Sequence, residues 1–177
     1  MRWLFLLIFI LNSCSNNPEV VKEFILNEAL PIERLKNAEI LHTENGILKV
    51  KLTATTIKRF KNIQPNLVIS DGFKIIFYND LGYETSVLTA SNANIDEIKN
   101  VMVASDRVVL KSSDSKRLET EKLVWDQKRH KIYTDKKVII TTDKEVVEGE
   151  GFESTPDFSK YFISNIQGTF NFENPAD

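Results

Sequence analysis

The sequence predicts an all-β protein, with an open, twisted β-jelly roll or sandwich built from repeated antiparallel hairpins. From Ile32 onward apolar and polar residues alternate with a period of two, most clearly over residues 48–54, as in strands with one buried and one exposed face. The motif Gly-x5-Leu-Thr-Ala occurs twice, starting at Gly46 and at Gly82. A turn followed by a strand, repeated along a chain, is typical of stacked hairpins.

The chain begins with a short apolar run from Trp3 to Leu11, followed by Asn12, Ser13 and Cys14. This run is far shorter than the ~20 residues of a transmembrane helix, so residues 1–13 are predicted to be a signal peptide that is removed. Residues 11–14 resemble the lipobox of bacterial lipoproteins, in which the cysteine is acylated and becomes the new N-terminus. Cys14 is therefore predicted to be the lipid anchor. A shortened membrane anchor with an incidental cysteine is the alternative.

The remaining 14–177 segment is predicted to contain one folded domain, which suits its length. Residues 14–31 form a lipidated tether with a short helix, because Pro18 suits an early helical position and Pro31 would end the helix. An extended linker is the alternative. The jelly roll is expected over residues 32–173, and residues 174–177 form a tail.

The strands are predicted from apolar runs that turn-forming residues separate. Asp71-Gly72 and Asp80-Leu81-Gly82 are expected to bracket a strand at 73–78, and a loop with Pro65 is expected at 61–70. Further strands are predicted at Tyr83–Ala90, Val101–Ala104, Arg107–Lys111, Arg117–Trp125, Lys131–Thr134, Lys137–Thr142, Glu145–Phe152 and Tyr161–Phe172.

Composition and charge narrow the class of function. The chain is 42% hydrophobic and 27% charged, which is typical of a globular protein. Its formal charge of −2 is close to neutral, so neither nucleic acid nor an anionic membrane surface is expected as a partner on charge grounds. No nucleotide-binding, nucleophile or metal-ligand motif is present, and no cofactor is predicted.

Two groups of residues could in principle carry chemistry. Glu119 and Glu121 would lie about 6.6–6.8 Å apart on one strand face, a separation that could suit a hydrolase, and residues 148–153 hold a second glutamate cluster. Both groups alternate with apolar residues, however, which favours a solvated strand face. His42 and His130 are expected in or beside polar turns. The protein is therefore predicted not to be an enzyme.

Inward positions mix small and large side chains, which is compatible with a hollow interior, although simple core packing explains any one of these positions better. The alanines at 54, 90, 93 and 104 accompany Leu88, Trp125, Phe152 and Phe170.

Several stretches resemble the LptC family of lipopolysaccharide-transport proteins, in a lipoprotein-anchored form, over about residues 30–172. The anchor departs from the well-studied form, which has a transmembrane helix. The stretches are Leu30–Glu33, Ala38–Gly46, Leu48–Ala54, Val87–Ala90, Arg117–Asp126, Glu148–Ser154 and Asp157–Tyr161.

The resemblance implies an open β-jelly roll on the periplasmic side of the inner membrane of a Gram-negative bacterium. It would receive lipopolysaccharide from an inner-membrane ABC transporter and pass it to a periplasmic bridge protein of the same fold. Since exposing an acyl chain of about a dozen carbons to water costs roughly 10 kcal/mol, such a carrier needs an apolar interior. The lipid-binding residues would be Val50, Leu52, Ala54, Phe77, Leu88, Ala90, Leu123, Trp125, Val138, Ile140, Phe152 and Phe170.

Joining to neighbouring proteins would occur by strand pairing at the sheet edges. Ile40 and Leu48 are expected on the edge that faces the transporter, and Ile163, Ile166 and Phe172 on the edge that faces the bridge protein.

Two other readings of the chain remain. It could be a structural or adhesive β-rich lipoprotein with a filled core. It could also be the soluble bridge protein itself, although the lipobox argues against this because a bridge needs no anchor.

Overall fold

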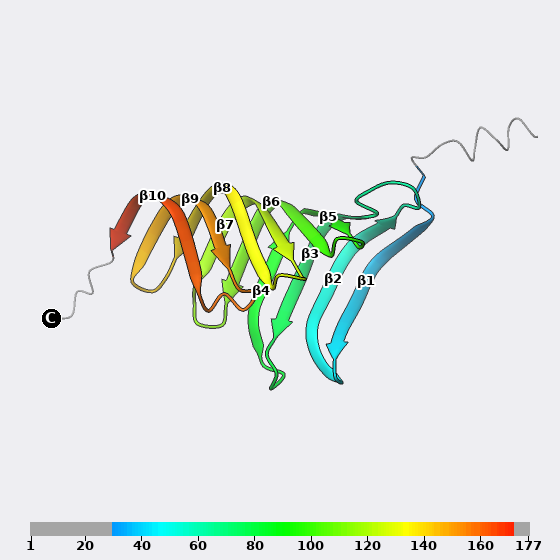
Figure 1. Ribbon diagram of the computed structural model, residues 1–177, viewed down its shortest axis with the longest axis horizontal. Coiled ribbons are helices and arrows are strands. Elements are labelled where there is room, and N and C mark those ends of the chain that lie inside the picture. Colours follow the sequence, from blue (N-terminus) through cyan, green and yellow to red (C-terminus); the bar gives the residue numbers. More distant parts are fainter. Residues whose placement is uncertain (1–29, 172–177) are drawn as a thin grey trace, which may run out of the picture. The chain divides into compact units, whose positions relative to one another are not determined.

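The computed structural model describes residues 30–171, and these residues form one antiparallel sheet of ten strands (Figure 1). The all-β prediction is confirmed. The strands are β1 (Glu33–Glu44), β2 (Ile47–Arg59), β3 (Leu67–Tyr78), β4 (Glu84–Ala90), β5 (Asn92–Asp96), β6 (Val101–Ser112), β7 (Arg117–Asp126), β8 (Lys131–Thr141), β9 (Glu145–Ser154) and β10 (Tyr161–Asn171).

The strand order follows the chain, β1-β2-β3-β4-β6-β7-β8-β9-β10, and β5 pairs with β3 and β6. Strands β4 and β5 are separated by Ser91 alone. The Gly72 N–H donates to the Ser91 carbonyl at 2.8 Å, and the Ser91 N–H donates to the Asp106 carbonyl at 2.9 Å. Thus β4 and β5 act as one strand that bends at Ser91 while it stays between the same two neighbours.

The other long strands bend at the same level as Ser91. The pairing shifts there, as between Ala54 and Thr56 or between Ser105 and Val108, and several residues there have positive φ, including Asp71 at 68°. Such bulges bend a strand and increase its twist. We call this line the corner row; it runs through Asn37, Thr55, Asp71, Gly72, Ser91, Asp106, Arg107, Glu121, Asp135 and Gly151.

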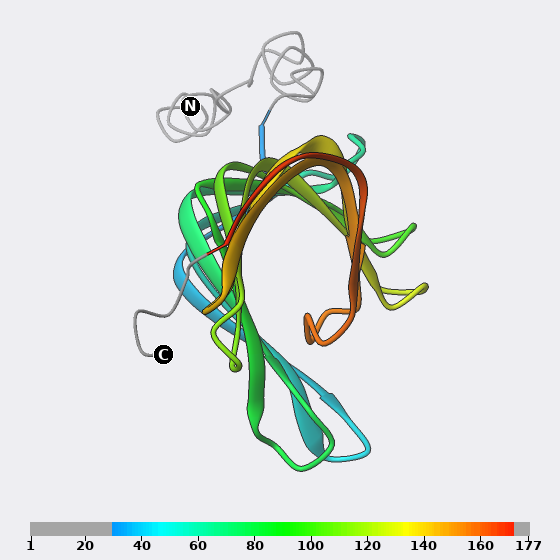
Figure 2. The same ribbon diagram turned by 90° about the vertical axis from the view of Figure 1, so that its left-hand side faces the viewer.

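The corner row folds the sheet into an arch with two facing layers (Figure 2). We call them the β4 layer and the β5 layer, after the short strand that each contains. The side chains that point into the arch form the core, and Leu118, Ile132 and Ile140 within it are 0% exposed. The jelly roll is therefore packed solid through much of its length, as in other protein interiors.

The two glycines of the repeated motif lie in hairpin turns, as predicted. Asn45 and Gly46 have φ values of 51° and 78° between β1 and β2, which suits a two-residue hairpin loop. Gly82, at 79°, lies between β3 and β4, where the Asn79 side chain accepts a hydrogen bond from the Tyr83 N–H at 3.0 Å.

Several predicted boundaries differ from the structure because a bulge and a turn share the same residue types. Asp71-Gly72 is a bulge inside β3, and residues 67–70 of the predicted loop belong to that strand. Residues 101–104 and 107–111 form the single strand β6, just as 131–134 and 137–141 form β8. Strand β5 was not predicted. The signal peptide, Cys14, nearly all of the tether with its helix, and the tail lie outside the described residues.

Candidate binding groove

A groove of about 870 Å³ opens between the layers where the solid core ends. The β1–β2 and β3–β4 hairpins extend past the rest of the sheet in both views (Figures 1 and 2), so their inner faces there lack an opposing strand. The apolar lining consists of Ile40, Val50, Leu52, Ile75, Phe77, Ile95, Met102 and Trp125.

Phe77 and Trp125 join the two layers at the floor of this groove. Phe77 comes from β3 in the β4 layer and Trp125 from β7 in the β5 layer. Their rings meet edge to face, with centroids 5.0 Å apart and planes at 87°, which is a favoured aromatic geometry. Ile75 and Met102, both about 1% exposed, pack into the core on either layer. The floor is therefore an apolar surface supported by rigid strands.

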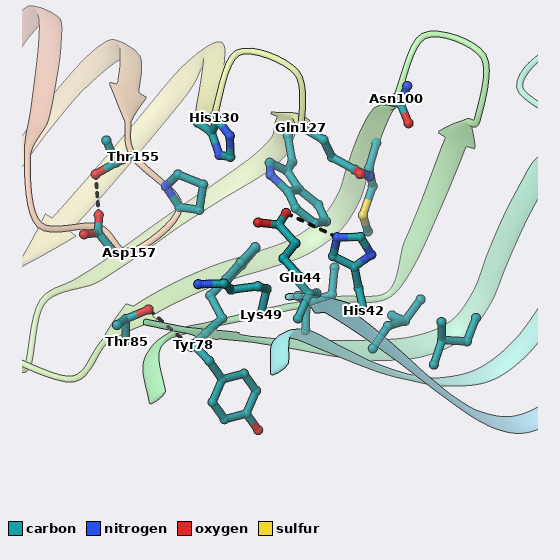
Figure 3. A pocket seen from close by; sticks show the side chains of 18 of the residues that line it. His42, Glu44, Lys49, Tyr78, Thr85, Asn100, Gln127, His130, Thr155 and Asp157 are labelled. Carbon is teal, nitrogen blue, oxygen red and sulfur yellow. Dashed lines mark hydrogen bonds and ion pairs between the residues drawn. The ribbon is translucent and has the colours of Figure 1, made fainter. Parts of the chain in front are cut away.

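The rim of the groove is polar and carries charges of both signs (Figure 3). Lys49 of β2 forms an ion pair with Asp80 of the β3–β4 turn. The hydrogen bond from Lys49 holds the pKa of the Asp80 carboxyl below its usual range, so this carboxylate stays ionised. On β1, His42 Nε2 lies 3.4 Å from Glu44 Oε1, and both side chains belong to the rim. An apolar floor with a polar rim suits an amphipathic ligand.

The loop between β9 and β10 forms another wall of the groove through Thr155, Pro156 and Asp157. Burial acts to raise the pKa of Asp157, but hydrogen bonds from Thr155 and Ser159 outweigh it and lower the pKa below its usual value. The Ser159 N–H donates to Asp157 Oδ1 at 3.1 Å. This charged side chain thus organises its own loop (Figure 3).

The predicted interior residues divide into two sets. Val50, Leu52, Phe77 and Trp125 line the groove. Strand β10 contains Phe170, whose side chain is outside the described part of the chain. The remaining positions are buried in the solid core: Ala54, Leu88, Ala90, Leu123, Val138, Ile140 and Phe152.

The edge strands of the sheet are β1 and β10. Ile40 lies on β1, whereas Leu48 lies one strand further in, on β2. On β10 Ile163 packs against the core, while Ile166 is 63% exposed. Phe172 lies outside the described residues.

Two apolar residues near the edge and the groove were missed by sequence reasoning. Phe162 of β10 is 66% exposed, and Phe158 in the β9–β10 loop is fully buried. Phe158 lies in a polar stretch that resembles a turn, so no periodic pattern marks it.

The carboxylates considered for catalysis are engaged in ion pairs or exposed. Arg117 Nη2 lies 2.6 Å from Glu119 Oε1, and its hydrogen bond lowers the pKa of Glu119. Glu121 is exposed in the corner row. Among residues 30–171 no three His, Cys, Asp or Glu side chains gather in a way that could hold a metal ion. Within the same range no helix has the length and apolar character needed to cross a membrane.

The comparisons with known proteins agree with this arrangement. The family described as lipopolysaccharide-assembly, LptC-related, matches residues 4–164. No curated protein matches the chain. Because the family match covers most of the sequence, the chain belongs to the LptC-related family, whose members are envelope-associated, periplasmic proteins of lipopolysaccharide transport.

Proposed function

We propose that the groove carries acyl chains of lipopolysaccharide between an inner-membrane ABC transporter and a periplasmic bridge protein of the same fold. The observation that supports this most is the groove itself, with its floor of Leu52, Phe77 and Trp125 below a polar rim. Acyl chains would lie on the floor, where each buried methylene contributes about 0.8 kcal/mol. The sugar and phosphate groups would remain at the rim or in water.

The two sheet edges support a relay with a neighbour on each side. Strand β1, whose Ile40 lines the groove, would face the transporter, and β10, with its exposed Ile166, would face the bridge protein. An unpaired edge recruits another strand through backbone hydrogen bonds. A strand added at β10 would extend the arch, so that the two interiors form one apolar path.

Acylation of Cys14 would hold the domain on the periplasmic side of the inner membrane. Stable anchoring of this kind requires more than one acyl chain.

A photoreactive amino acid provides the direct test of the groove. At Trp125, which lines the groove, we expect it to capture lipopolysaccharide in cells. At Ile140, which is fully buried in the solid core, we expect no capture, although both positions face inward. Capture at neither position would overturn the proposed carrier.

The alternative function, a structural lipoprotein with a filled core, is favoured by the solid packing around Leu118, Ile132 and Ile140. Depletion of the protein separates the two functions. A carrier predicts that lipopolysaccharide accumulates at the inner membrane, whereas a structural lipoprotein predicts no such accumulation.

A further inference from the structure

The β9–β10 loop, Thr155–Lys160, inserts a single aromatic ring into the arch. The ring of Phe158 is 0% exposed. Its centroid lies 5.7 Å from that of Phe152 with an interplanar angle of 84°, and 5.5 Å from that of Tyr161 with an angle of 62°. Figure 2 shows this loop, in orange, turned inward below the β5 layer. Phe158 therefore fills the interior from a loop, unlike the other core residues, which come from strands.

Polar contacts connect this loop to the β4 layer. The Ser86 hydroxyl donates a hydrogen bond to the Pro156 carbonyl. Lys116 Nζ donates to the Phe158 carbonyl at 3.1 Å and lies 5.7 Å from the centroid of its ring. Each contact joins a side chain to the loop rather than extending a sheet ladder. The loop can thus leave its place without breaking the pairing of β9 with β10.

The backbone of Phe158 has a φ of 56°. This left-handed conformation is unfavourable for a bulky residue and persists only where surrounding contacts hold it. The burial of the ring therefore offsets local strain. Movement of the loop would relieve that strain, which lowers the free-energy cost of taking the ring out.

The loop also forms a boundary of the groove. Thr155, Pro156 and Asp157 line it, whereas Phe158 contacts Phe152 and Tyr161 on the side of β10. The ring thus lies between the space available in the groove and the strand proposed to meet the bridge protein.

We propose that the ring of Phe158 occupies a latent acyl-chain subsite, and that an acyl chain displaces the ring when lipid advances from the groove toward β10. This inference rests on the proposed function. The Phe158 ring and an acyl chain are both apolar, so either can fill this part of the core. A cavity at this position would destabilise the protein. The loop thus closes the subsite when no lipid is bound.

Removal of the ring should make loading easier. Glycine suits a φ of 56°, so Phe158→Gly removes the ring and relieves the strain at once. Because the closed loop leaves only a fraction of the protein competent, the variant should reach half-saturation at an about tenfold lower lipid concentration. Ile69→Val is the control, because Ile69 is 0% exposed and its cross-strand partners, Ile57 and Ala93, neither line the groove nor belong to the loop. It should leave the titration unchanged.

The titration uses the full chain with Trp3→Phe, so that Trp125 in the groove is the only tryptophan. Purified lipopolysaccharide is added, and the emission of Trp125 reports its entry. If Phe158→Gly binds at the same or a higher concentration than the parent while Trp125 still responds, the subsite is wrong and the groove remains a carrier. If lipid leaves the emission unchanged in both proteins, the proposed function and the subsite both fail.

Hydrogen exchange provides a second measurement on the parent chain. The Phe158 N–H donates to the Thr155 carbonyl at 2.9 Å. Lipid that displaces the ring should speed exchange of this amide, although a ligand usually slows exchange where it binds. Slower or unchanged exchange, with Trp125 responding, would contradict displacement.

Discussion

Ile163 of β10 packs directly over Gly149 of β9, so that a β-carbon at Gly149 would overlap the Ile163 side chain and lie 2.8 Å from the Asn165 carbonyl oxygen. The last strand of the sheet is therefore seated on a position that has no side chain. This contact determines how closely the proposed bridge-facing edge packs against the core.

Gly149→Ala should destabilise the protein by about 1–3 kcal/mol, because overpacking at a tight contact forces backbone shifts. Urea unfolding monitored by circular dichroism measures the loss as a shift of the midpoint. Glu150→Ala, at the exposed neighbouring position, should change the midpoint little. The double variant Gly149→Ala with Ile163→Ala should recover part of the loss, because the two residues are in contact. If the stability losses of the two single variants simply add in the double variant, Ile163 does not pack on Gly149.

The Phe77–Trp125 contact should contribute to stability as well as to the groove. Trp125→Ala should cost about 1–3 kcal/mol, less than the loss expected for a fully buried aromatic residue, because the indole is only partly buried. Trp125→Phe keeps an aromatic partner for Phe77 and should retain most of the stability. Thermal unfolding followed by far-UV circular dichroism distinguishes them, and equal losses would argue against a role for the ring contact.

The β9–β10 loop should weaken at acid pH. The pKa of Asp157 is lowered below its usual value of 3.8 in the folded protein, so the unfolded chain binds the proton more readily. The stabilisation is therefore complete above the unfolded pKa and is lost as the pH falls through the lower folded pKa. In a series of melting curves between about pH 2 and 6, Asp157→Asn should lack this part of the acid sensitivity. If the melting temperature of Asp157→Asn falls with pH as steeply as that of the parent, the carboxylate does not hold the loop.

Arg59 of β2 links the beginning of β1 to the residue that follows β5 through two ion pairs. Its Nε lies 3.1 Å from Glu33 Oε2, and its Nη1 pairs with Glu97 at the end of the β5 layer. Hydrogen bonds from Arg59 to Glu97 and then Glu33 raise the pKa of the guanidinium group.

Arg59→Met should therefore cost at most about 1 kcal/mol, as for other exposed ion pairs. It should also speed hydrogen exchange of the Ile32 N–H, which donates to the Arg59 carbonyl at 2.9 Å. Lys58→Met, one position earlier on the other face of β2, should leave that exchange rate unchanged. Equal acceleration by both variants would mean that charge removal alone loosens the strand.

Much of the fold could be predicted because alternation along the strands is strong. Residues 48–54 and the two turn glycines define hairpins locally, without knowledge of the rest of the chain. The corner row could not be predicted, since Asp106 and Arg107 are ordinary polar residues whose positive φ depends on the neighbouring strands. This is why β6 and β8 were each expected as two strands.

The candidate site was predicted only in part, for a physical reason. Inward positions such as Trp125 and Ile140 follow the same alternation, and what separates groove from core is whether an opposing layer covers them. That depends on how far each hairpin extends, which only the assembled sheet decides. Phe158 enters the core from a polar loop, where period-two patterning carries no signal.

The alignment of the bends has a consequence for any partner that joins the sheet at β10. A straight incoming strand could pair with only one half of β10, because β10 follows the bend of β9 at Gly151 (Figure 2) and its pairing with β9 shifts between Ile166 and Gly168. A guest strand that carries its own kink at that height would match both halves at once. The shape of the backbone alone would then exclude flat strands, including those of aggregating chains, whatever side chains they carry.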